Sequence, residues 1–287
     1  MSLPADIQHA IESHLNTAVV SSQWIGGGDI NEAAQVETAS ERFFVKWNPH
    51  SPPGMFTAEA RGLNLLASAG TLKVPQVILS SEKPAFLALE WLPIERPKNP
   101  TVFADHLGEG LARLHQITQD KHGLDHDNYI GRLHQSNTPT QSWAAFYRDQ
   151  RIRVQMGIAR QNGRLNPERE RLLERLCEKL PGILPDVSPS LLHGDLWGGN
   201  YSGITGDLPV IYDPAVYYGH REVEMAFTEL FGGFPGRFYE AYNAAFPLDK
   251  GYMERKALYQ LYPLLVHLNL FGEGYGSHVD SIARRYA

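Results

Sequence analysis

The stretch that decides the fold is Leu192-His193-Gly194-Asp195-Leu196-Trp197-Gly198-Gly199-Asn200. Its core is a His-x-Asp triplet, and an asparagine follows the aspartate after four further residues. Asp213 lies thirteen residues beyond Asn200, directly after the apolar run 209–212. We expect two short strands, over 190–193 and 210–212, to bring Asp195, Asn200 and Asp213 together.

Phosphoryl transfer from ATP requires such a set of side chains. One carboxylate orients the acceptor hydroxyl and takes its proton, while a carboxamide and a second carboxylate hold Mg²⁺ against the phosphates. The spacing is similar to the catalytic loop and the metal-binding aspartate of eukaryotic-type kinases. Taken alone, the motif also fits a surface turn in which Asp195 and Asn200 satisfy backbone donors. The residues that precede it in the chain favour the first interpretation.

Three glycines, Gly26-Gly27-Gly28, separate two predicted strands, 17–25 and 32–38. A kinase needs a glycine-rich turn at this place to cover the phosphates of the nucleotide. The triplet does not follow the Gly-x-Gly-x-x-Gly pattern of protein kinases, and by itself it also fits an ordinary tight turn.

Lys46 lies on the next predicted strand, 42–47, and shares one face of it with Phe44. A lysine on a partly apolar face needs a partner or a ligand. In kinases an acid on the following helix holds this lysine. We expect Glu59, on the helix predicted after residue 53, to be that acid, and Glu41 is the alternative. The order of glycine turn, lysine, acid, catalytic motif and final aspartate indicates a kinase.

The same region argues against a protein kinase. Pro214-Ala215 follows Asp213 in place of Phe-Gly, and a helical pattern begins by about Glu222. This leaves no room for a long activation loop. Gly194 stands where an arginine would bind a phosphorylated loop. We therefore expect a small-molecule acceptor, held by the helical part of the chain.

The pattern predicts an α+β, bilobal, protein-kinase-like fold. Residues 1–92 are expected to form the nucleotide-binding lobe, an antiparallel sheet with a leading helix and one inserted helix. Two further strands are predicted at 76–80 and 85–92. Three prolines, Pro93, Pro97 and Pro100, mark the lobe boundary. Residues 93–287 are expected to form a mainly helical lobe that carries the catalytic loop and the acceptor site.

The composition sets limits on the function. The 287 residues carry 26 Lys+Arg and 32 Asp+Glu, a net charge of −6, which gives no electrostatic footprint for nucleic acid. No apolar run of 18 residues is present, so we expect no membrane span. The N-terminus lacks the pattern of a secretory signal, and the single cysteine, Cys177, allows no intrachain disulfide, so a cytoplasmic location is expected. Cys177 and His115 both lie on apolar stripes and are interpreted as core residues.

The motifs resemble those of the fructosamine (ketosamine) kinase family over nearly the whole chain. The matching segments are Gly26-Gly27-Gly28-Asp29-Ile30-Asn31, Phe43-Phe44-Val45-Lys46, Thr57-Ala58-Glu59-Ala60, 190–200, 213–222, 229–234, 259–262 and 268–272. The resemblance implies an aminoglycoside-phosphotransferase-like kinase fold that uses ATP and Mg²⁺. It also implies phosphorylation of the sugar 3-hydroxyl of a fructose-amine adduct. The phosphorylated adduct is unstable and can release the amine, so the family is regarded as deglycating.

The resemblance further implies roles for individual residues. Asp195 would be the general base, and Asn200 and Asp213 would bind the metal. The implied nucleotide-binding residues are Gly26, Gly27, Gly28, Lys46, Glu59 and a hinge of Glu90, Trp91 and Leu92, whose backbone would meet adenine. The implied acceptor residues are Trp197, Tyr217, Tyr218 and Glu222.

Other functions stay open at this point. An aminoglycoside, choline or another sugar could be the acceptor on the same fold, and a nucleotide-binding module without catalysis is the alternative outside enzymes. The sequence leaves undecided which amine the adduct carries and whether the substrate is a small molecule or a glycated protein. It also does not determine the oligomeric state.

Overall fold

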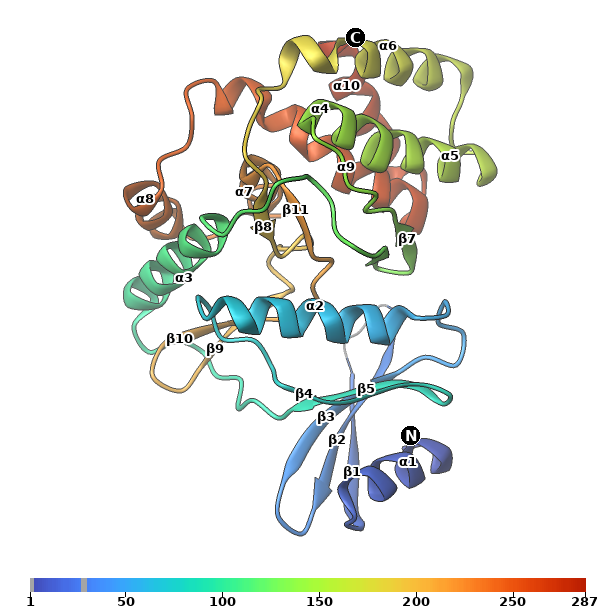
Figure 1. Cartoon of the computed structure of the whole chain (residues 1–287), viewed down its shortest axis with the longest axis vertical. Helices are drawn as coiled ribbons and strands as arrows, with labels where there is room; N and C mark the ends of the chain where they lie inside the picture. The colour runs from blue at the N-terminus through green and yellow to red at the C-terminus, as the bar shows by residue number, and fades with distance from the viewer. Residues whose placement is uncertain (1–2, 27–29) are drawn as a thin grey trace.

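The N-terminal part of the computed structural model, which describes residues 3–26 and 30–287, is built on a five-stranded antiparallel sheet (Figure 1). Its strand order is β1-β2-β3-β5-β4. The strands are β1 (Val19–Ile25), β2 (Glu32–Thr38), β3 (Arg42–Trp47), β4 (Val77–Glu82) and β5 (Ala85–Glu90). All five strands were predicted, with ends that differ by one or two residues, and the predicted leading helix is α1 (Ala5–Leu15).

Alternation along β3 determines which residues face the rest of the protein. Phe43, Val45 and Trp47 are buried in one cluster with Ile7 and Ile11 of α1. Successive side chains on a strand point to opposite faces. The other face of β3 therefore carries Phe44 and Lys46, the face that the inserted helix covers.

The inserted helix, α2 (Met55–Ala69), buries a stripe that includes Phe56, Leu63 and Leu66. These positions are seven and three residues apart, which places them on one helix face. Glu59 lies on that same face, three residues after Phe56 and four before Leu63. The helix thus presents one carboxylate toward the sheet among apolar neighbours.

The second half of the chain is mainly helical and lies above the sheet in Figure 1. Its first helix is α3 (Pro100–His115), whose first turn is capped by the Asn99 side chain. The other helices are α4 (Trp143–Phe146), a π-helix η1 (Tyr147–Ile152), α5 (Arg153–Gln161), α6 (Pro167–Ile183), α7 (Arg221–Thr228), α8 (Gly236–Ala245), α9 (Tyr252–Phe271), a 3₁₀ turn η2 (Glu273–Tyr275) and α10 (Gly276–Tyr286). An irregular segment, 91–99, separates β5 from α3 at the place where the lobe boundary was predicted.

Three short antiparallel pairs complete the fold. They are β8 (Ser190–Leu192) with β11 (Tyr217–Gly219), β9 (Tyr201–Ile204) with β10 (Leu208–Ile211), and β6 (Asn128–Ile130) with β7 (Leu133–Gln135). The sequence predicted β8 and β10 and missed the other four, because strands of three or four residues are too short for alternation to be recognised. The loop 193–200 joins β8 to β9, and Asp213 lies between β10 and β11.

The core of the helical half is continuous with the α2 side of the sheet. It includes the predicted stripe Leu107, Leu111 and Leu114 of α3, and Cys177 of α6 lies in it with no exposed surface. Burial raises the pKa of the Cys177 thiol to about 12, so this cysteine is an unreactive core residue. Within residues 3–26 and 30–287 we find no helix that is long and apolar enough to span a membrane.

Close packing of α3 against α8 predicts the effect of a single methyl group. A Cβ at Gly108 would lie 2.9 Å from the backbone nitrogen of Tyr242 and still closer to the carbonyl oxygen of Phe238. We expect Gly108→Ala to lower the free energy of unfolding by about 2 kcal/mol, because the helices must separate. Gly157 of α5 is the control, since a Cβ added there would have no other atom within 4 Å. There alanine should stabilise the helix by up to about 1 kcal/mol, and urea unfolding of both variants measures the difference.

Candidate active site

One lysine joins the two halves of the protein. The Lys46 Nζ atom lies 2.6 Å from Oε1 of Glu59 and 2.7 Å from Oδ1 of Asp213. Burial opposes the charge on Lys46, but the two carboxylates together hold the pKa of its ammonium above the ordinary value. Glu41, the alternative partner, is exposed in the turn before β3. The structure therefore brings together Lys46, Glu59 and Asp213, which come from β3, α2 and the turn after β10.

Asp213 adopts an uncommon backbone conformation. Its φ of 57° lies in the left-handed region, which a residue other than glycine enters only where its surroundings impose it. On one side the carbonyl of Tyr212 contacts Nε2 of His193 at 3.0 Å, and on the other the N–H of Ala215 donates to the carbonyl of His193 at 2.9 Å. The Asp213 side chain is 51% exposed, and Lys46 occupies only its Oδ1. The second carboxylate oxygen is thus available to the cleft.

Asp195 and Asn200 form a pair within the loop 193–200. Nδ2 of Asn200 donates to the backbone carbonyl of Asp195 at 2.7 Å and to its Oδ2 at 3.2 Å. Burial and the nearby charge of Asp213 raise the pKa of Asp195 well above 3.8, although the Asn200 contact lowers it. A carboxylate with a raised pKa is a better proton acceptor near neutral pH.

His193 organises this loop by contacts on both ring nitrogens. The N–H of Asp195 donates to Nδ1 at 3.3 Å, so Nε2 carries the proton that is donated to the carbonyl of Tyr212. Burial lowers the pKa of His193, which favours this neutral form. The next residue, Gly194, has a φ of 85°, and a Cβ there would lie 2.7 Å from the carbonyl carbon of Ala215. No side chain fits at position 194, so the arginine of protein kinases has no counterpart here.

Lys46 and Glu59 line a cleft of about 1010 Å³ together with the catalytic-loop pair and Asp213. Ile25, Gly26, Ala33 and Phe44 line it from the sheet side, and Asp195, Asn200 and Asp213 from the other. The remaining wall includes Trp197, Phe231, His267, Phe271 and Tyr275. Trp197 was a predicted acceptor residue, whereas no sequence motif singles out the other four rings within the aromatic-rich stretch 231–275. Burial lowers the pKa of His267, whose Nδ1 lies 2.8 Å from the carbonyl of Pro263.

Some of the predicted nucleotide-binding residues line the cleft and others do not. Gly26 lines the cleft, whereas Gly27 and Gly28 fall outside the described residues. Glu90 directs its side chain to Lys73, with 2.6 Å between Oε2 and Nζ, and it also accepts the N–H of Gln76. Glu90, Trp91 and Leu92 contribute no atoms to the cleft wall. Their expected role concerns backbone contacts to adenine, and it stays a prediction.

Three predicted acceptor residues lie outside the cleft, which corrects the sequence interpretation. Tyr217 is buried under Arg151, whose guanidinium carbon lies 4.0 Å from the ring centroid. The Tyr218 backbone pairs with Gly123. The Glu222 carboxylate is fully buried and accepts two hydrogen bonds from Arg255, at 2.7 and 2.9 Å. The physical reason is that β11 runs from Asp213 back into the helical core, away from the cleft.

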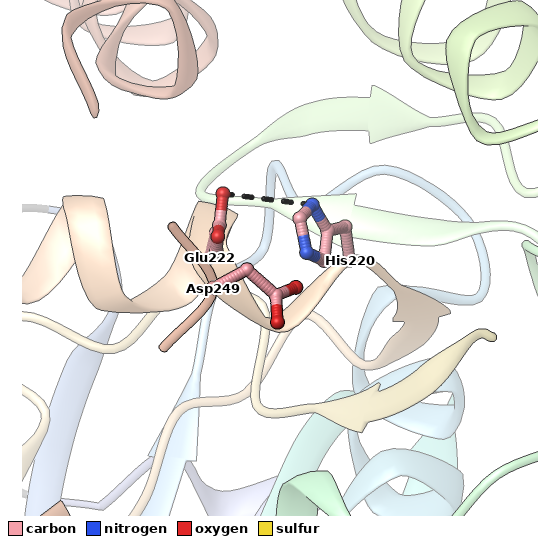
Figure 2. Close-up of side chains that lie close together, drawn as sticks. All are labelled: His220, Glu222 and Asp249. Atoms are coloured by element: carbon pink, nitrogen blue, oxygen red, sulfur yellow. Dashed lines mark ion pairs between the residues drawn. The ribbon is translucent and has the colours of Figure 1, made fainter. Parts of the chain in front are cut away.

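Glu222 also belongs to a cluster that could be mistaken for a metal site. His220, Glu222 and Asp249 offer ligand atoms that lie within 4.8 Å of one another (Figure 2). Arg255 already neutralises Glu222 through both carboxylate oxygens. Nδ1 of His220 lies 2.7 Å from the hydroxyl of Tyr259. These contacts explain the cluster as an ion-pair network of the core.

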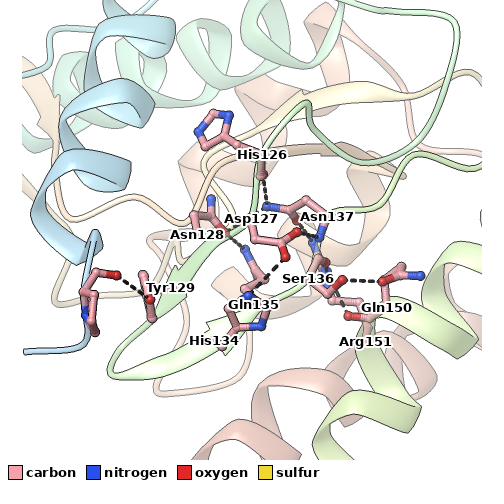
Figure 3. A network of polar contacts seen from close by, with 11 residues as sticks. His126, Asp127, Asn128, Tyr129, His134, Gln135, Ser136, Asn137, Gln150 and Arg151 are labelled. Carbon is pink, nitrogen blue, oxygen red and sulfur yellow. Dashed lines mark hydrogen bonds and ion pairs between the residues drawn. The ribbon is translucent and has the colours of Figure 1, made fainter.

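The β6–β7 hairpin forms another wall of the cleft, with residues 128–131. Figure 3 shows the polar network behind it. Nε2 of Gln135 donates to Oδ1 of Asn128 and to the carbonyl of Ala215, at 2.8 and 3.0 Å. The Asn128 amide donates to the carbonyl of Val216 at 2.7 Å, and Arg151 donates to the Asn137 side chain at 2.9 Å. The hairpin is therefore fixed to the segment that follows Asp213, although its sequence carried no recognisable motif.

Comparison with known proteins supplies the context for this geometry. A model of the family described as fructosamine kinase matches residues 4–287. The "Probable ketoamine kinase" of Lactiplantibacillus plantarum is 41% identical over 276 residues, which cover 94% of this chain and 95% of that protein. The "Protein-ribulosamine 3-kinase, chloroplastic" of Oryza sativa subsp. japonica is 36% identical over 278 residues, which cover 94% of this chain and 80% of that one.

Solved structures agree with this comparison. The "Putative fructosamine-3-kinase" from Haemophilus somnus has a TM-score of 0.87 and 33% identity, with 98% of this chain and 96% of that chain covered. The ADP-bound aminoglycoside phosphotransferase APH(2'')-Ib shares 14% identity and a TM-score of 0.65, with 98% and 97% covered, and this likeness shows the fold alone.

The bilobal fold and the comparisons define the class: an ATP-dependent phosphotransferase with a protein-kinase-like fold. This confirms the fold class predicted from the sequence. Within that class, the match over residues 4–287 identifies the group, and the chain belongs to the fructosamine kinase family. The resemblance to this family that the sequence motifs indicated is thereby confirmed.

Removing the ammonium of the lysine bridge should destabilise the fold. In Lys46→Met the buried Glu59 carboxylate loses its counter-ion, and we expect a loss of about 3 kcal/mol in the free energy of unfolding at pH 8. Burial already raises the pKa of Glu59 above 4.5, and without Lys46 it should rise further. A carboxyl group with a raised folded pKa takes up a proton as the pH falls, so the loss should be smaller at pH 5. Urea unfolding at both pH values measures it.

The matched variant for this experiment is Lys46→Met combined with Glu59→Gln. The glutamine leaves no unpaired buried charge, and Asp213, which also loses Lys46, is half exposed, so the double variant should recover most of the lost stability at pH 8. Equal instability of the single and double variants would contradict the ion-pair explanation.

Proposed function

We propose that this protein transfers the terminal phosphoryl group of ATP to the sugar 3-hydroxyl of a ketosamine, the adduct of a sugar and an amine. The observation that carries the proposal is that one cleft holds the Asp195–Asn200 pair opposite the Lys46–Asp213 ion pair. The names of its relatives, a ketoamine kinase and a ribulosamine 3-kinase, support this acceptor class. The substrate is either a small ketosamine or a glycated amine on a larger molecule, and the enzyme acts in the cytoplasm, where ATP is available.

Asp195 acts as the general base in this proposal. Asn200 orients its carboxylate, and the raised pKa lets it take the proton of the acceptor hydroxyl as the oxygen attacks phosphorus. Lys46 contacts the nucleotide phosphates, and Glu59 holds the lysine in place. Gly26 covers the phosphates from the sheet side of the cleft, while the backbone of Glu90, Trp91 and Leu92 meets adenine.

The donor atoms fit a magnesium ion. Asn200 uses its Nδ2 for Asp195, so the oxygen of the same amide is the atom left to bind a cation. Asp213 contributes the carboxylate oxygen that Lys46 does not use. Oxygen donors of this kind are those that Mg²⁺ prefers, and the ion supplies charge neutralisation for the phosphates when bound. The cleft wall carries the three carboxyl groups of Glu59, Asp195 and Asp213 but only one ammonium, that of Lys46, so negative charge is in surplus.

The acceptor end of the cleft is aromatic. Trp197 is 36% exposed, and its ring lies nearly perpendicular to that of Phe231, with 6.4 Å between the ring centroids. His267 packs against Phe231 at 4.5 Å and against Tyr275 at 5.1 Å. A wall of rings provides an apolar surface for the carbon face of a sugar and a negative ring face for a cationic amine. We therefore place the ketosamine between this wall and Asp195.

The role of Asp195 has a direct test. Asp195→Asn keeps the shape of the side chain but removes the proton acceptor, so turnover should fall about 10³-fold while ATP binding changes little. ADP release from Mg²⁺·ATP is measured with and without a fructose-amine adduct, in the wild-type protein and in the variant. Near-normal turnover of the variant would refute the assignment. A wild-type protein that binds ATP but is not stimulated by the adduct would refute the ketosamine, and aminoglycosides, choline and simple sugars would be tested instead.

The role of Asp213 is tested by metal-dependent nucleotide binding. Asparagine tolerates the left-handed backbone at this position, so Asp213→Asn removes the charge without forcing the turn to change. We expect the Mg²⁺ dependence of ATP affinity to disappear and the affinity at saturating Mg²⁺ to fall about tenfold or more. Calorimetric titrations over a series of Mg²⁺ concentrations measure both effects. An unchanged Mg²⁺ dependence would contradict the assignment.

A further inference from the structure

The last part of the aromatic wall lies on a segment with little apolar packing of its own. Phe271 ends α9 and Tyr275 belongs to η2, and both rings line the cleft. None of the three residues of η2 is buried. Three of the residues 272–276 are glycines, and glycine loses more conformational freedom on folding than any other residue. Contacts with the rest of the protein must therefore fix the place of Tyr275.

Arg169 of α6 supplies such contacts. Its guanidinium donates through Nη2 to Oε1 of Glu273 at 2.5 Å and through Nη1 to Oε2 at 3.2 Å. It also donates through Nε and Nη2 to the two carboxylate oxygens of Asp280 on α10, at 2.7 and 3.1 Å. The Arg169 side chain is 2% exposed, and Asp280 and Glu273 together raise the pKa of its guanidinium. One buried cation thus joins α6 to η2 and to α10.

The place of Arg169 in its own helix is unfavourable on local grounds. It lies in the first turn of α6, where the helix dipole favours acidic side chains. Glu168 and Glu170 on either side follow that preference. The partners of Arg169 come from 104 and 111 residues further along the chain. A tertiary contact, and not the stability of α6, therefore accounts for an arginine at this position.

Arg164, in the loop before α6, fixes the other end of the segment. Its Nη1 donates to the backbone carbonyl of Asn269 at 2.7 Å and to that of Leu268. Both carbonyls belong to the last turn of α9, where the helix itself supplies too few amide donors. Nη1 of Arg169 donates in turn to the carbonyl of Arg164 at 2.5 Å, which connects the two arginines. The end of α9 and η2 are therefore held from the same side.

We propose that Arg169 is a positioning residue for the acceptor: it fixes Glu273 and thereby sets the place of Tyr275 in the aromatic wall. This rests on the proposed function, which places the ketosamine against that wall. The Tyr275 ring packs against His267, with 5.1 Å between the centroids, and against Phe271 at 6.5 Å. A shift of η2 would move this ring relative to its neighbours and leave the sheet side of the cleft, the proposed place of ATP, unchanged.

Kinetics with both substrates test the proposal. Arg169→Met removes the guanidinium but keeps an unbranched apolar side chain. We expect the KM for the fructose-amine adduct to rise about tenfold, since the loss of one or two ring contacts has an effect of this size. The kcat and the KM for ATP should stay within about twofold. Arg169→Lys keeps the charge but not the fork that binds two carboxylates, so the KM for the adduct should rise less, about threefold.

Gly276→Ala disturbs the same contact without removing a charge. A Cβ at Gly276 would overlap Oε1 of Glu273 and Nη2 of Arg169, which are the ends of flexible side chains, so the pair must shift while the fold is retained. The same selective rise in the KM for the adduct is expected. The matched control is Arg284→Met, because Arg284 of α10 forms an exposed ion pair with Glu168 of α6 at 3.2 Å. Losing this pair between the same two helices should leave both KM values unchanged.

A second measurement does not depend on the acceptor. Hydrogen exchange of the peptides that cover residues 268–278, followed by mass spectrometry, reports how firmly the segment is held. Exchange should be faster in Arg169→Met and in Gly276→Ala than in the wild type. It should stay at the wild-type rate in Arg284→Met.

The outcomes separate the alternatives. Wild-type kinetics and exchange in Arg169→Met would overturn the proposal, and so would faster exchange with an unchanged KM for the adduct. An equal rise of both KM values with a loss of kcat, or the same changes in Arg284→Met, would show that Arg169 only stabilises the fold. A wild-type protein that binds ATP but does not phosphorylate the ketosamine would refute the proposed function, while the exchange measurement would still decide whether Arg169 holds η2.

Discussion

The ion pairs of one lysine hold the active cleft together. Lys46 is carried by the sheet, Glu59 by the helix that covers the sheet, and Asp213 by a turn in the helical half. An ammonium with little access to water requires counter-charges at short range, because a buried charge without a partner is costly. The position of each lobe is therefore coupled to the other through three side chains, of which Lys46 contacts the phosphates in the proposed mechanism.

The same interaction determines the electrostatics of the cleft. Lys46 neutralises part of the negative charge of Glu59 and Asp213, and the rest of that charge acts on Asp195. Burial and the charge of Asp213 raise the pKa of Asp195. The surplus of negative charge favours a cation in the cleft, and the raised pKa of Asp195 agrees with its proposed role as the base. In the proposed mechanism Lys46, the metal-binding oxygens and the base thus form one electrostatic unit rather than separate sites. A change at any one of them alters the others.

The sequence predicts the elements and residues that carry a chemical motif or a periodic pattern. It does not predict those that have neither. The alternation of Phe43, Val45 and Trp47 predicted β3 and the face of Lys46. The spacing of the His-x-Asp motif predicted that Asp195, Asn200 and Asp213 lie together, and all three line the cleft. Tyr217 and Glu222 were misplaced because their residue types suit a binding site, whereas only the course of β11 shows that they face the core. The hairpin 128–131 and the rings of Phe231 and His267 were missed because tertiary contacts, not local sequence, bring them to the cleft.

The two short strand pairs explain why the motif residues meet with so little regular structure around them. β8 pairs with β11 and β9 pairs with β10, so the loop 193–200 and the turn at Asp213 are enclosed between the same strands. Strands of three or four residues contribute few hydrogen bonds, and side chains must supply the remaining constraints. His193 joins loop and turn from within, and Glu224 holds the loop from the core. Buried polar contacts therefore hold the residues of the site in place. This explains why charged side chains lie in the core behind the site.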